Sequence, residues 1–346
     1  MRRLITILLL IALVQFTARA QHSFREAAEA IANDDLLTLK SFVKEQPSLA
    51  MAHDSVSRST LLHLAASRGA DDVCNFLIRS HANVNARDSV GGTPLEAAVY
   101  RDRLTVVKIL VEAGADVHLG RTRNNAFFLS LWQRDTSLVR YLLDHGCSAT
   151  EPDERGTRPL DVAASFGTID IMRVLLSAGA EVCNGHRDSC ATAWWAAIDP
   201  EVEKMEYVRS LGADLNFRSS SGVTVLQQAL DLGNWNVAMF LAGHGARVVT
   251  ADDTLPVLCR IVGRSDDTSL VAYFFHRGAS VNAVATRTGS AALSIAIENK
   301  NRSVAAWLLE HGADPAYINK NGESALAIAQ RMGEQEIAAS ILKRQR

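Results

Sequence analysis

Histidine is the residue type in this chain that most directly suggests a chemical role, because its imidazole ring is a common metal ligand and the chain has ten histidines. His145, His244 and His311 each stand immediately before a glycine that recurs along the chain, and His63 follows Thr60-Leu61-Leu62. Equivalent residues of neighbouring sequence repeats lie about 10 Å apart, whereas zinc–nitrogen bonds are about 2 Å long. We therefore expect these histidines to bond to backbone groups, and we predict no metal site.

The catalytic sequence motifs that could accompany such histidines are missing. The sequence contains no G-x-S-x-G nucleophile elbow, no P-loop, no H-E-x-x-H and no dinucleotide-binding glycine pattern. Its formal net charge of −2 also argues against broad contact with a phosphate backbone. We predict a protein with no enzymatic activity, no cofactor and no nucleic-acid partner.

The first twenty residues predict a secretory signal peptide. Met1-Arg2-Arg3 is basic, residues 4–14 are apolar apart from Thr6, and Ala18-Arg19-Ala20 places small residues before a cleavage site at Gln21. The apolar run is short for a hydrocarbon core of about 30 Å, and an uncleaved anchor is the alternative. Removing residues 1–20 leaves 33 basic and 38 acidic residues, a net charge of −5. We expect an exported chain, periplasmic or secreted, whose mature part does not insert into a membrane.

A regular period organises the rest of the chain. A glycine followed by a small residue recurs at nearly constant steps, at Gly114-Ala115, Gly146-Cys147, Gly179-Ala180, Gly212-Ala213, Gly245-Ala246, Gly278-Ala279 and Gly312-Ala313. His81-Ala82 lies one period before the first and lacks only the glycine. Between these glycines, an opening such as Thr93-Pro94-Leu95 and two apolar runs predict two antiparallel helices per repeat. The glycine is expected to end the second helix in a left-handed conformation.

These motifs resemble the ankyrin repeat, a helix–turn–helix unit of about 33 residues with a β-turn finger. Thr93-Pro94-Leu95 and Gly114-Ala115-Asp116-Val117 carry the resemblance, which covers about residues 22–345. It implies an all-α fold, an α-solenoid of about ten stacked repeats that start near residues 22, 54, 88, 119, 151, 185, 218, 250, 284 and 318.

The ends of the stack are expected to differ from its middle. We predict an N-terminal capping repeat over residues 21–53, ankyrin repeats 2–9 over 54–317 and a C-terminal capping repeat over 318–346. Each repeat of such a stack contacts only its neighbours, so we expect no boundary between domains.

The five cysteines fall into two groups. Cys74, Cys147 and Cys259 occupy positions that the repeat fills with small apolar residues, and we expect them to be buried. Cys183 and Cys190 fall on opposite arms of one finger, where an oxidising compartment would allow a disulfide bond. The alternative for this pair is two independent thiols.

The residues that the repeat does not specify are the best candidates for binding. The resemblance places on the concave face the two residues that follow the Ala-Ala position of each first helix, the position of Ala65-Ala66 in repeat 2. In repeats 3, 4 and 5 these pairs are Tyr100/Arg101, Trp132/Gln133 and Ser165/Phe166. Large aromatic side chains dominate binding hot spots. We predict a partner-binding site at Tyr100, Arg101, Trp132, Gln133 and Phe166; the alternative is that the rings pack on their neighbours and shield the helix ends.

Arginines in the fingers predict a partly basic rim beside this groove. They are Arg121, Arg123, Arg155, Arg158, Arg187 and Arg218, diluted by the acidic residues Glu151, Asp153 and Glu154. Arg123 and Arg155 complete the predicted partner-binding set. Such a rim would speed association with an acidic partner surface. The alternative is a solvated rim of mixed charge.

Together these patterns predict a non-enzymatic scaffold that acts outside the cytoplasm. We expect a monomer that binds a protein partner on its concave face and stabilises or inhibits an envelope protein by occlusion. In that mechanism the aromatic residues contact the partner and the finger arginines orient it. The alternative is a secreted effector that binds and perturbs host proteins.

Overall fold

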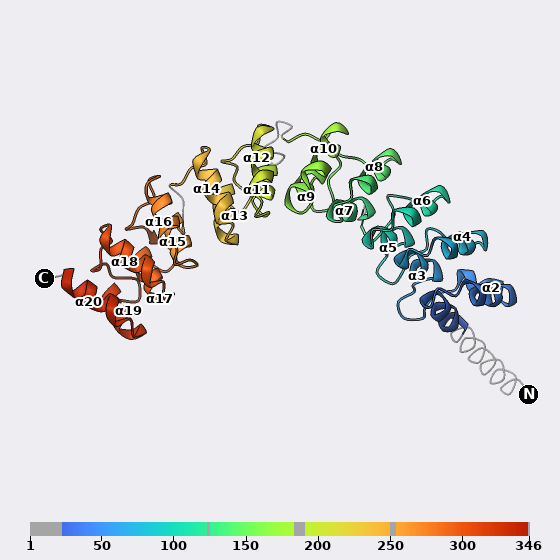
Figure 1. Ribbon diagram of the computed structural model, residues 1–346, viewed down its shortest axis with the longest axis horizontal. Coiled ribbons are helices and arrows are strands. Elements are labelled where there is room, and N and C mark those ends of the chain that lie inside the picture. Colours follow the sequence, from blue (N-terminus) through green and yellow to red (C-terminus); the bar gives the residue numbers. More distant parts are fainter. Residues whose placement is uncertain (1–22, 123–124, 183–190, 250–253, 345–346) are drawn as a thin grey trace, which may run out of the picture. The chain divides into compact units, whose positions relative to one another are not determined.

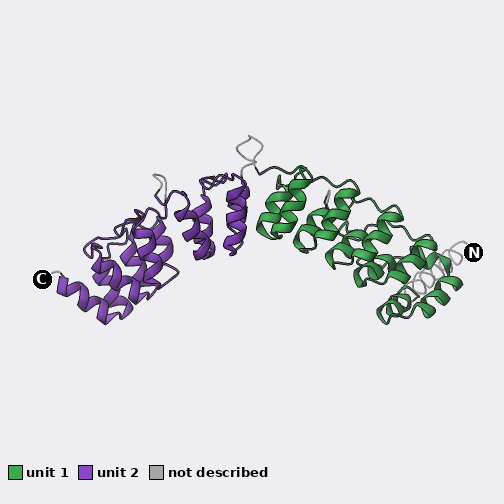
Figure 2. Cartoon of the chain, turned by 45° about the horizontal axis from the view of Figure 1, so that its top comes forward, with its two compact units in different colours: residues 1–181 green, residues 182–346 purple. Residues whose placement is uncertain are grey.

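The computed structural model describes residues 23–122, 125–182, 191–249 and 254–344 (Figure 1). Over these residues the chain is mostly helical, and successive helices form antiparallel pairs. The predicted signal peptide, the Cys183–Cys190 pair, Arg123 and Arg187 lie outside the described residues. The chain divides into two compact units, unit 1 with residues 1–181 and unit 2 with residues 182–346 (Figure 2).

Unit 1 begins with a helix of residues 23–32, followed by α2 (Leu36–Glu45) and the short 3₁₀ helix η1 (Pro47–Met51). Its further helices are α3 (Leu61–Arg68), α4 (Asp71–Arg79), α5 (Pro94–Tyr100), α6 (Leu104–Glu112), α7 (Asn125–Trp132), α8 (Thr136–Asp144), α9 (Pro159–Ser165) and α10 (Ile169–Ser177). Odd-numbered helices from α3 onward are the first helices of their repeats, and even-numbered helices are the second.

Unit 2 continues the same alternation. Its helices are α11 (Thr192–Ala196), α12 (Val202–Ser210), α13 (Val225–Leu232), α14 (Trp235–Gly243), α15 (Val257–Val262), α16 (Thr268–Phe275), α17 (Ala292–Glu298), α18 (Arg302–Glu310), α19 (Ala325–Met332) and α20 (Gln335–Arg344). Strands β1 (Val284–Ala285) and β2 (Ser290–Ala291) pair antiparallel, with Val284 opposite Ala291. The described residues thus form ten helix pairs, which confirms the predicted all-α repeat fold.

Within each unit the hydrophobic core runs through the stacked pairs. In unit 1, α3 packs on α5, α5 on α7 and α7 on α9, while α4 packs on α6. Leu62, Leu95 and Leu110 are fully buried between these helices, and each buried leucine contributes about 1.5–3 kcal/mol. The buried alanines Ala66 and Ala98 leave room for the first helices to approach closely.

The repeat glycine ends the second helix as its pattern predicts. Gly114 has a φ of 89°, in the left-handed region that glycine adopts without steric cost. His81, at the equivalent position of the preceding repeat, has a φ of 65°. The chain therefore keeps the same turn where the glycine is missing, at a cost of about 1 kcal/mol.

Histidines at the ends of second helices bond to the backbone, which confirms their predicted structural role. Nδ1 of His145 donates to the Tyr141 carbonyl at 2.7 Å, and His244 and His311 make the same bond at 2.8 Å. Their rings lie 3.7–4.1 Å from the ring centroids of Tyr141, Phe240 and Trp307. Within the described ranges, no group of three or more metal-ligating side chains is arranged to hold an ion.

The three described cysteines are buried, as predicted. Burial raises the pKa of the Cys74 and Cys147 thiols to about 12. Cys259 donates its thiol proton to the Ala283 carbonyl at 3.3 Å. The Cys74 and Cys147 thiols therefore lack the thiolate character that cysteine chemistry requires. None of the described helices is long and apolar enough to cross a membrane.

Candidate partner-binding surface

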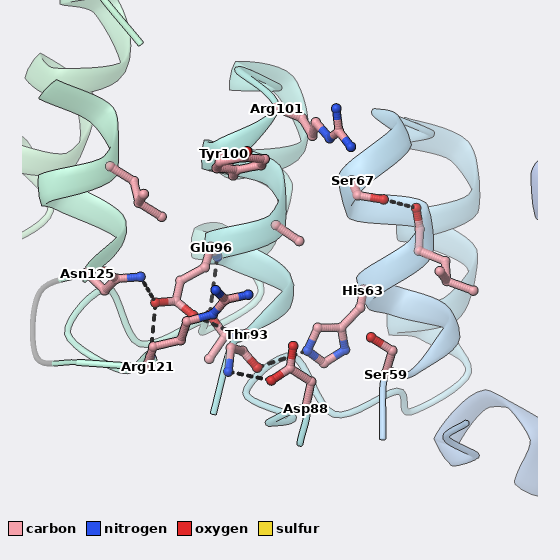
Figure 3. Close-up of a pocket in the computed structure, with 14 residues that line it drawn as sticks. Ser59, His63, Ser67, Asp88, Thr93, Glu96, Tyr100, Arg101, Arg121 and Asn125 are labelled. Atoms are coloured by element: carbon pink, nitrogen blue, oxygen red, sulfur yellow. Dashed lines mark hydrogen bonds between the residues drawn. The ribbon is translucent and has the colours of Figure 1, made fainter. Parts of the chain in front are cut away.

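The first helices and fingers of unit 1 form one face of that unit, called here the inner face. A pocket of about 540 Å³ lies on it along α3, α5 and α7 (Figure 3). At one end of the pocket Asp88, Thr93 and Arg121 mark the fingers, and at the other end lie Tyr100 and Arg101. The two ends are separated by the length of α5, about 10 Å.

Glu96 holds the finger end of the pocket together. Thr93 caps α5, and the Glu96 side chain completes a capping box by accepting from the Thr93 N–H at 2.9 Å. The same carboxylate accepts from the Arg121 N–H at 3.0 Å and from the Asn125 side-chain amide. Glu96 is buried, and its carboxylate joins one repeat to the finger and first helix of the next.

His63 has the equivalent place in the preceding repeat, where it also accepts from the threonine N–H but donates to the next repeat instead of accepting from it. Its Nδ1 accepts from the Thr60 N–H at 3.1 Å, and its Nε2 donates to the Gly92 carbonyl at 3.1 Å. Ser59, His63 and Asp88 line one pocket, and these residue types can form a nucleophilic site. Both ring nitrogens of His63 are already bonded, one to Thr60 and the other to Gly92 of the next repeat, so in this arrangement the ring is not placed to take a proton from Ser59.

Burial makes the stability of this contact depend on pH. It lowers the pKa of His63, because the charged ring loses hydration. In the unfolded chain this histidine binds a proton near its usual pKa of 6.5, whereas in the folded chain it does so only at lower pH. The free energy of unfolding therefore falls as the solution is acidified through pH 6.5. We expect His63→Gln to cost about 1 kcal/mol at pH 7.5 and to lessen the loss of stability between pH 7 and pH 5. Urea unfolding followed by circular dichroism measures both, and parallel pH profiles of the two proteins would contradict the assignment.

At the other end of the first helices lie the three predicted aromatic residues, called here the aromatic ridge. Tyr100 ends α5, Trp132 ends α7 and Phe166 follows α9, with 60%, 55% and 41% of their surfaces exposed. The rings of Trp132 and Phe166 stack, with centroids 4.6 Å apart and planes 23° from parallel. The rings do pack on each other, and they still leave a large aromatic area open to solvent.

The two polar members of the predicted set lie beside the ridge. The Arg101 guanidinium lies 5.6 Å from the Tyr100 ring centroid, a distance typical of a cation–π contact. Gln133 donates from Nε2 to the Tyr100 carbonyl at 2.8 Å and thereby joins two successive repeats. The structure therefore places Tyr100, Arg101, Trp132, Gln133 and Phe166 along one edge of the inner face.

The predicted basic rim is smaller than the sequence suggests. Arg158 forms a two-pronged ion pair with Asp161, at 3.0 and 2.9 Å, and also donates to the Glu181 carbonyl. Its side chain is only 14% exposed, so the prediction that Arg158 belongs to an accessible rim is wrong. Arg121 and Arg155 are exposed in unit 1, at the finger end and not at the ridge. Arg218 is exposed in unit 2.

Comparison with known proteins decides the family. A family model described as "Ankyrin repeats (3 copies)" matches residues 27–121, 119–186 and 258–346, more than half of the chain. The chain belongs to the ankyrin repeat family. Ankyrin repeats generally mediate protein–protein interaction, and proteins built from them are typically non-enzymatic interaction scaffolds.

Its ankyrin repeats are similar to those of much longer proteins. The chain is 31% identical over 176 residues to an ankyrin repeat and KH domain-containing protein, mask-1, of Caenorhabditis elegans, covering 50% of this chain and 6% of that protein. It is 23% identical over 237 residues to the human transient receptor potential cation channel subfamily A member 1, covering 65% and 21%. The chain thus spans under a quarter of the length of these relatives.

A solved structure shows the same fold. The crystal structure of the human ASB11 ankyrin repeat domain superposes with a TM-score of 0.56 at 24% identity. The superposition covers 64% of this chain and 99% of that domain. At this identity the likeness establishes the ankyrin fold and leaves the partner to be inferred from the surface.

Two features of the site were not predicted from the ankyrin pattern. Glu96 stands where the preceding repeat has His63, and this exchange in Thr93-Pro94-Leu95-Glu96 was the available signal. Arg68 precedes Arg101 by one repeat period and so occupies the same repeat position, next to the ridge. That spacing could have extended the predicted site by one repeat.

Proposed function

We propose that this protein is a scaffold that binds one protein partner with the inner face of unit 1. The observation that carries the proposal is the stacked and exposed pair Trp132 and Phe166, continued by Tyr100. Aromatic side chains of this size bury roughly 150–250 Å² each when a partner covers them, and such anchors contribute about 2 kcal/mol or more. Binding then acts by occlusion of the partner surface.

We also propose that the protein acts outside the cytoplasm. The basic start, apolar run and Ala18-Arg19-Ala20 support export, because this arrangement is what signal peptidases and the secretion machinery read. In that setting the partner is an envelope protein that the scaffold stabilises or inhibits. The buried, protonated thiols of Cys74 and Cys147 are compatible with an oxidising compartment, because they offer no reactive thiolate.

Fractionation combined with affinity capture tests this function. The proposal expects a mature chain that begins at Gln21, recovered from the periplasm in a stoichiometric complex with one protein. Recovery from the culture medium would instead favour an effector that acts on host proteins. A full-length chain that stays in the cytosol would overturn the export part of the proposal, and purified mature chain with no stoichiometric partner would overturn binding.

A further inference from the structure

A second hollow extends the candidate surface toward the N-terminal end of unit 1. It has a volume of about 630 Å³ and shares Leu64, Ser67 and Arg101 with the pocket described above. Its charged lining consists of four arginines and one acid, namely Arg25, Arg68, Arg101, Arg103 and Glu29. The hollow is therefore a cationic continuation of the pocket that Tyr100 lines.

Three of these four arginines form no ion pair within the described part of the chain. Arg25 pairs with Glu29 at 3.2 Å, but both side chains are largely exposed, and such a pair is weak. Arg68 donates to a neutral group, the Ala32 carbonyl, at 2.9 Å. Neither Arg101 nor Arg103 forms an ion pair with any residue of the described part of the chain.

The fold fixes where these arginines lie. Arg68 ends α3, Arg101 follows α5, and Arg103 precedes α6 with its side chain against Gly69. A Cβ atom at Gly69 would lie 2.8 Å from Cδ of Arg103, so the glycine leaves the space that this side chain occupies. Burial and the neighbouring Asp135 raise the pKa of the adjacent Asp102, which also interacts with Arg103, whose charge lowers that pKa.

The inner face of unit 1 thus has a cationic part and an aromatic part. Its cationic part lies over repeats 1 to 3, and its aromatic part, Trp132 and Phe166, lies over repeats 4 and 5. First helices packed at roughly 8–10 Å give about 27 Å from α3 to α9. An extended chain rises about 3.3 Å per residue, so roughly eight or nine residues cover this distance.

We infer that the occupant of this face is an extended segment of the partner, acidic toward Arg68 and Arg101 and apolar toward Trp132 and Phe166. The acidic end is inferred from charge complementarity with the arginines of the hollow. Because these arginines are spread over three elements, several successive carboxylates can each lie near one of them. The inference rests on the proposed function, since it names the chemistry of the partner that the ridge binds.

A designed probe tests the inference with the purified chain. The probe is a fluorescein-labelled peptide Glu-Glu-Glu-Gly-Ser-Gly-Trp-Leu-Phe, compared with versions that carry lysines for the glutamates or serines for the apolar block. We expect the acidic probe to bind at least tenfold more tightly than the lysine version, with an affinity that falls steeply as salt is added. No binding of the acidic probe up to roughly 1 mM would overturn the inference.

Charge reversal locates the binding. Arg68→Glu with Arg101→Glu is expected to weaken the acidic probe at least tenfold and to flatten its salt dependence. The matched control is Arg79→Glu with Arg140→Glu, which makes the same charge change on exposed residues of α4 and α8. Because Arg68→Glu also removes a hydrogen bond, Arg101→Glu alone is measured as well, and thermal unfolding checks each fold. An equal loss in the control pair would contradict the inference.

The same variants separate this inference from the proposed function when the captured partner replaces the probe. If alanine replacement of Trp132 and Phe166 abolishes partner binding and charge reversal at Arg68 and Arg101 does not, the proposed function stands. The inference of an acidic partner segment is then wrong. Loss in neither set would overturn the assignment of binding to this face. Loss in both sets is the result expected.

Discussion

Replacing Trp132 and Phe166 together by alanine is expected to weaken partner binding at least thirty-fold, which corresponds to about 2 kcal/mol. The two rings stack at 4.6 Å and are about half exposed, so the free protein presents a preformed aromatic surface. A partner that covers the two rings buries their apolar surface at little cost in side-chain entropy, because each ring already packs on the other. Titration calorimetry with the captured partner measures the change.

The stability of the double variant should change little, since neither ring is part of the buried core. Leu232→Ala is the matched control, because Leu232 is half exposed at the end of the first helix α13 in unit 2. We expect this control to bind the partner normally. If both proteins bind with wild-type affinity, or if both lose affinity equally, the ridge is not the binding site.

Replacing Glu96 by alanine is expected to lower the free energy of unfolding by about 3 kcal/mol. The buried carboxylate accepts from the Thr93 N–H, the Arg121 N–H and the Asn125 amide, and alanine leaves all three donors without their acceptor. Urea unfolding of the purified chain measures the loss. Glu112→Ala, which removes an exposed carboxylate at the end of α6, is the control and should stay within about 0.5 kcal/mol of the wild type.

Two further replacements at Glu96 test whether its hydrogen-bond acceptors hold the two repeats together. Glu96→His installs the side chain that the preceding repeat uses, and His63 succeeds there because it donates to the Gly92 carbonyl. At position 96 the next finger offers the Arg121 N–H, which is itself a donor. We therefore expect Glu96→His to be destabilising and Glu96→Gln, which keeps an acceptor, to be the mildest change. A histidine variant as stable as the wild type would contradict this account of how the two repeats join.

The repeat fold was predictable because its signals are local and periodic. The regular step between glycines fixes where second helices end, and the structure keeps the left-handed turn even at His81. The position of Tyr100, Trp132 and Phe166 at the ends of first helices predicted exposed rings, with packing of the rings on their neighbours as the alternative. The structure shows exposure together with the stacking of Trp132 on Phe166, and this stacking depends on how closely two repeats pack.

The electrostatic details were harder to predict for the same reason. Arg158 stands in a finger like Arg155, yet its guanidinium turns onto Asp161 in the first turn of α9. The cationic hollow combines Arg25, Arg68 and Arg103, which belong to three different repeats of the sequence. Only the equal repeat positions of Arg68 and Arg101 pointed to it. Side chains that meet across repeats carry little signal within any one of them.

Site-specific photocrosslinking in the producing cell tests whether the aromatic ridge binds a protein, and it needs no knowledge of the partner. A photoreactive phenylalanine analogue is placed at Trp132, at Phe166 or, as the control, at Leu232, and each chain is irradiated and analysed on denaturing gels. We expect one discrete protein adduct at Trp132 and Phe166 and none at Leu232, with the adduct lost on charge reversal at Arg68 and Arg101. Adducts at Leu232 alone, or none at either ridge position, would contradict it.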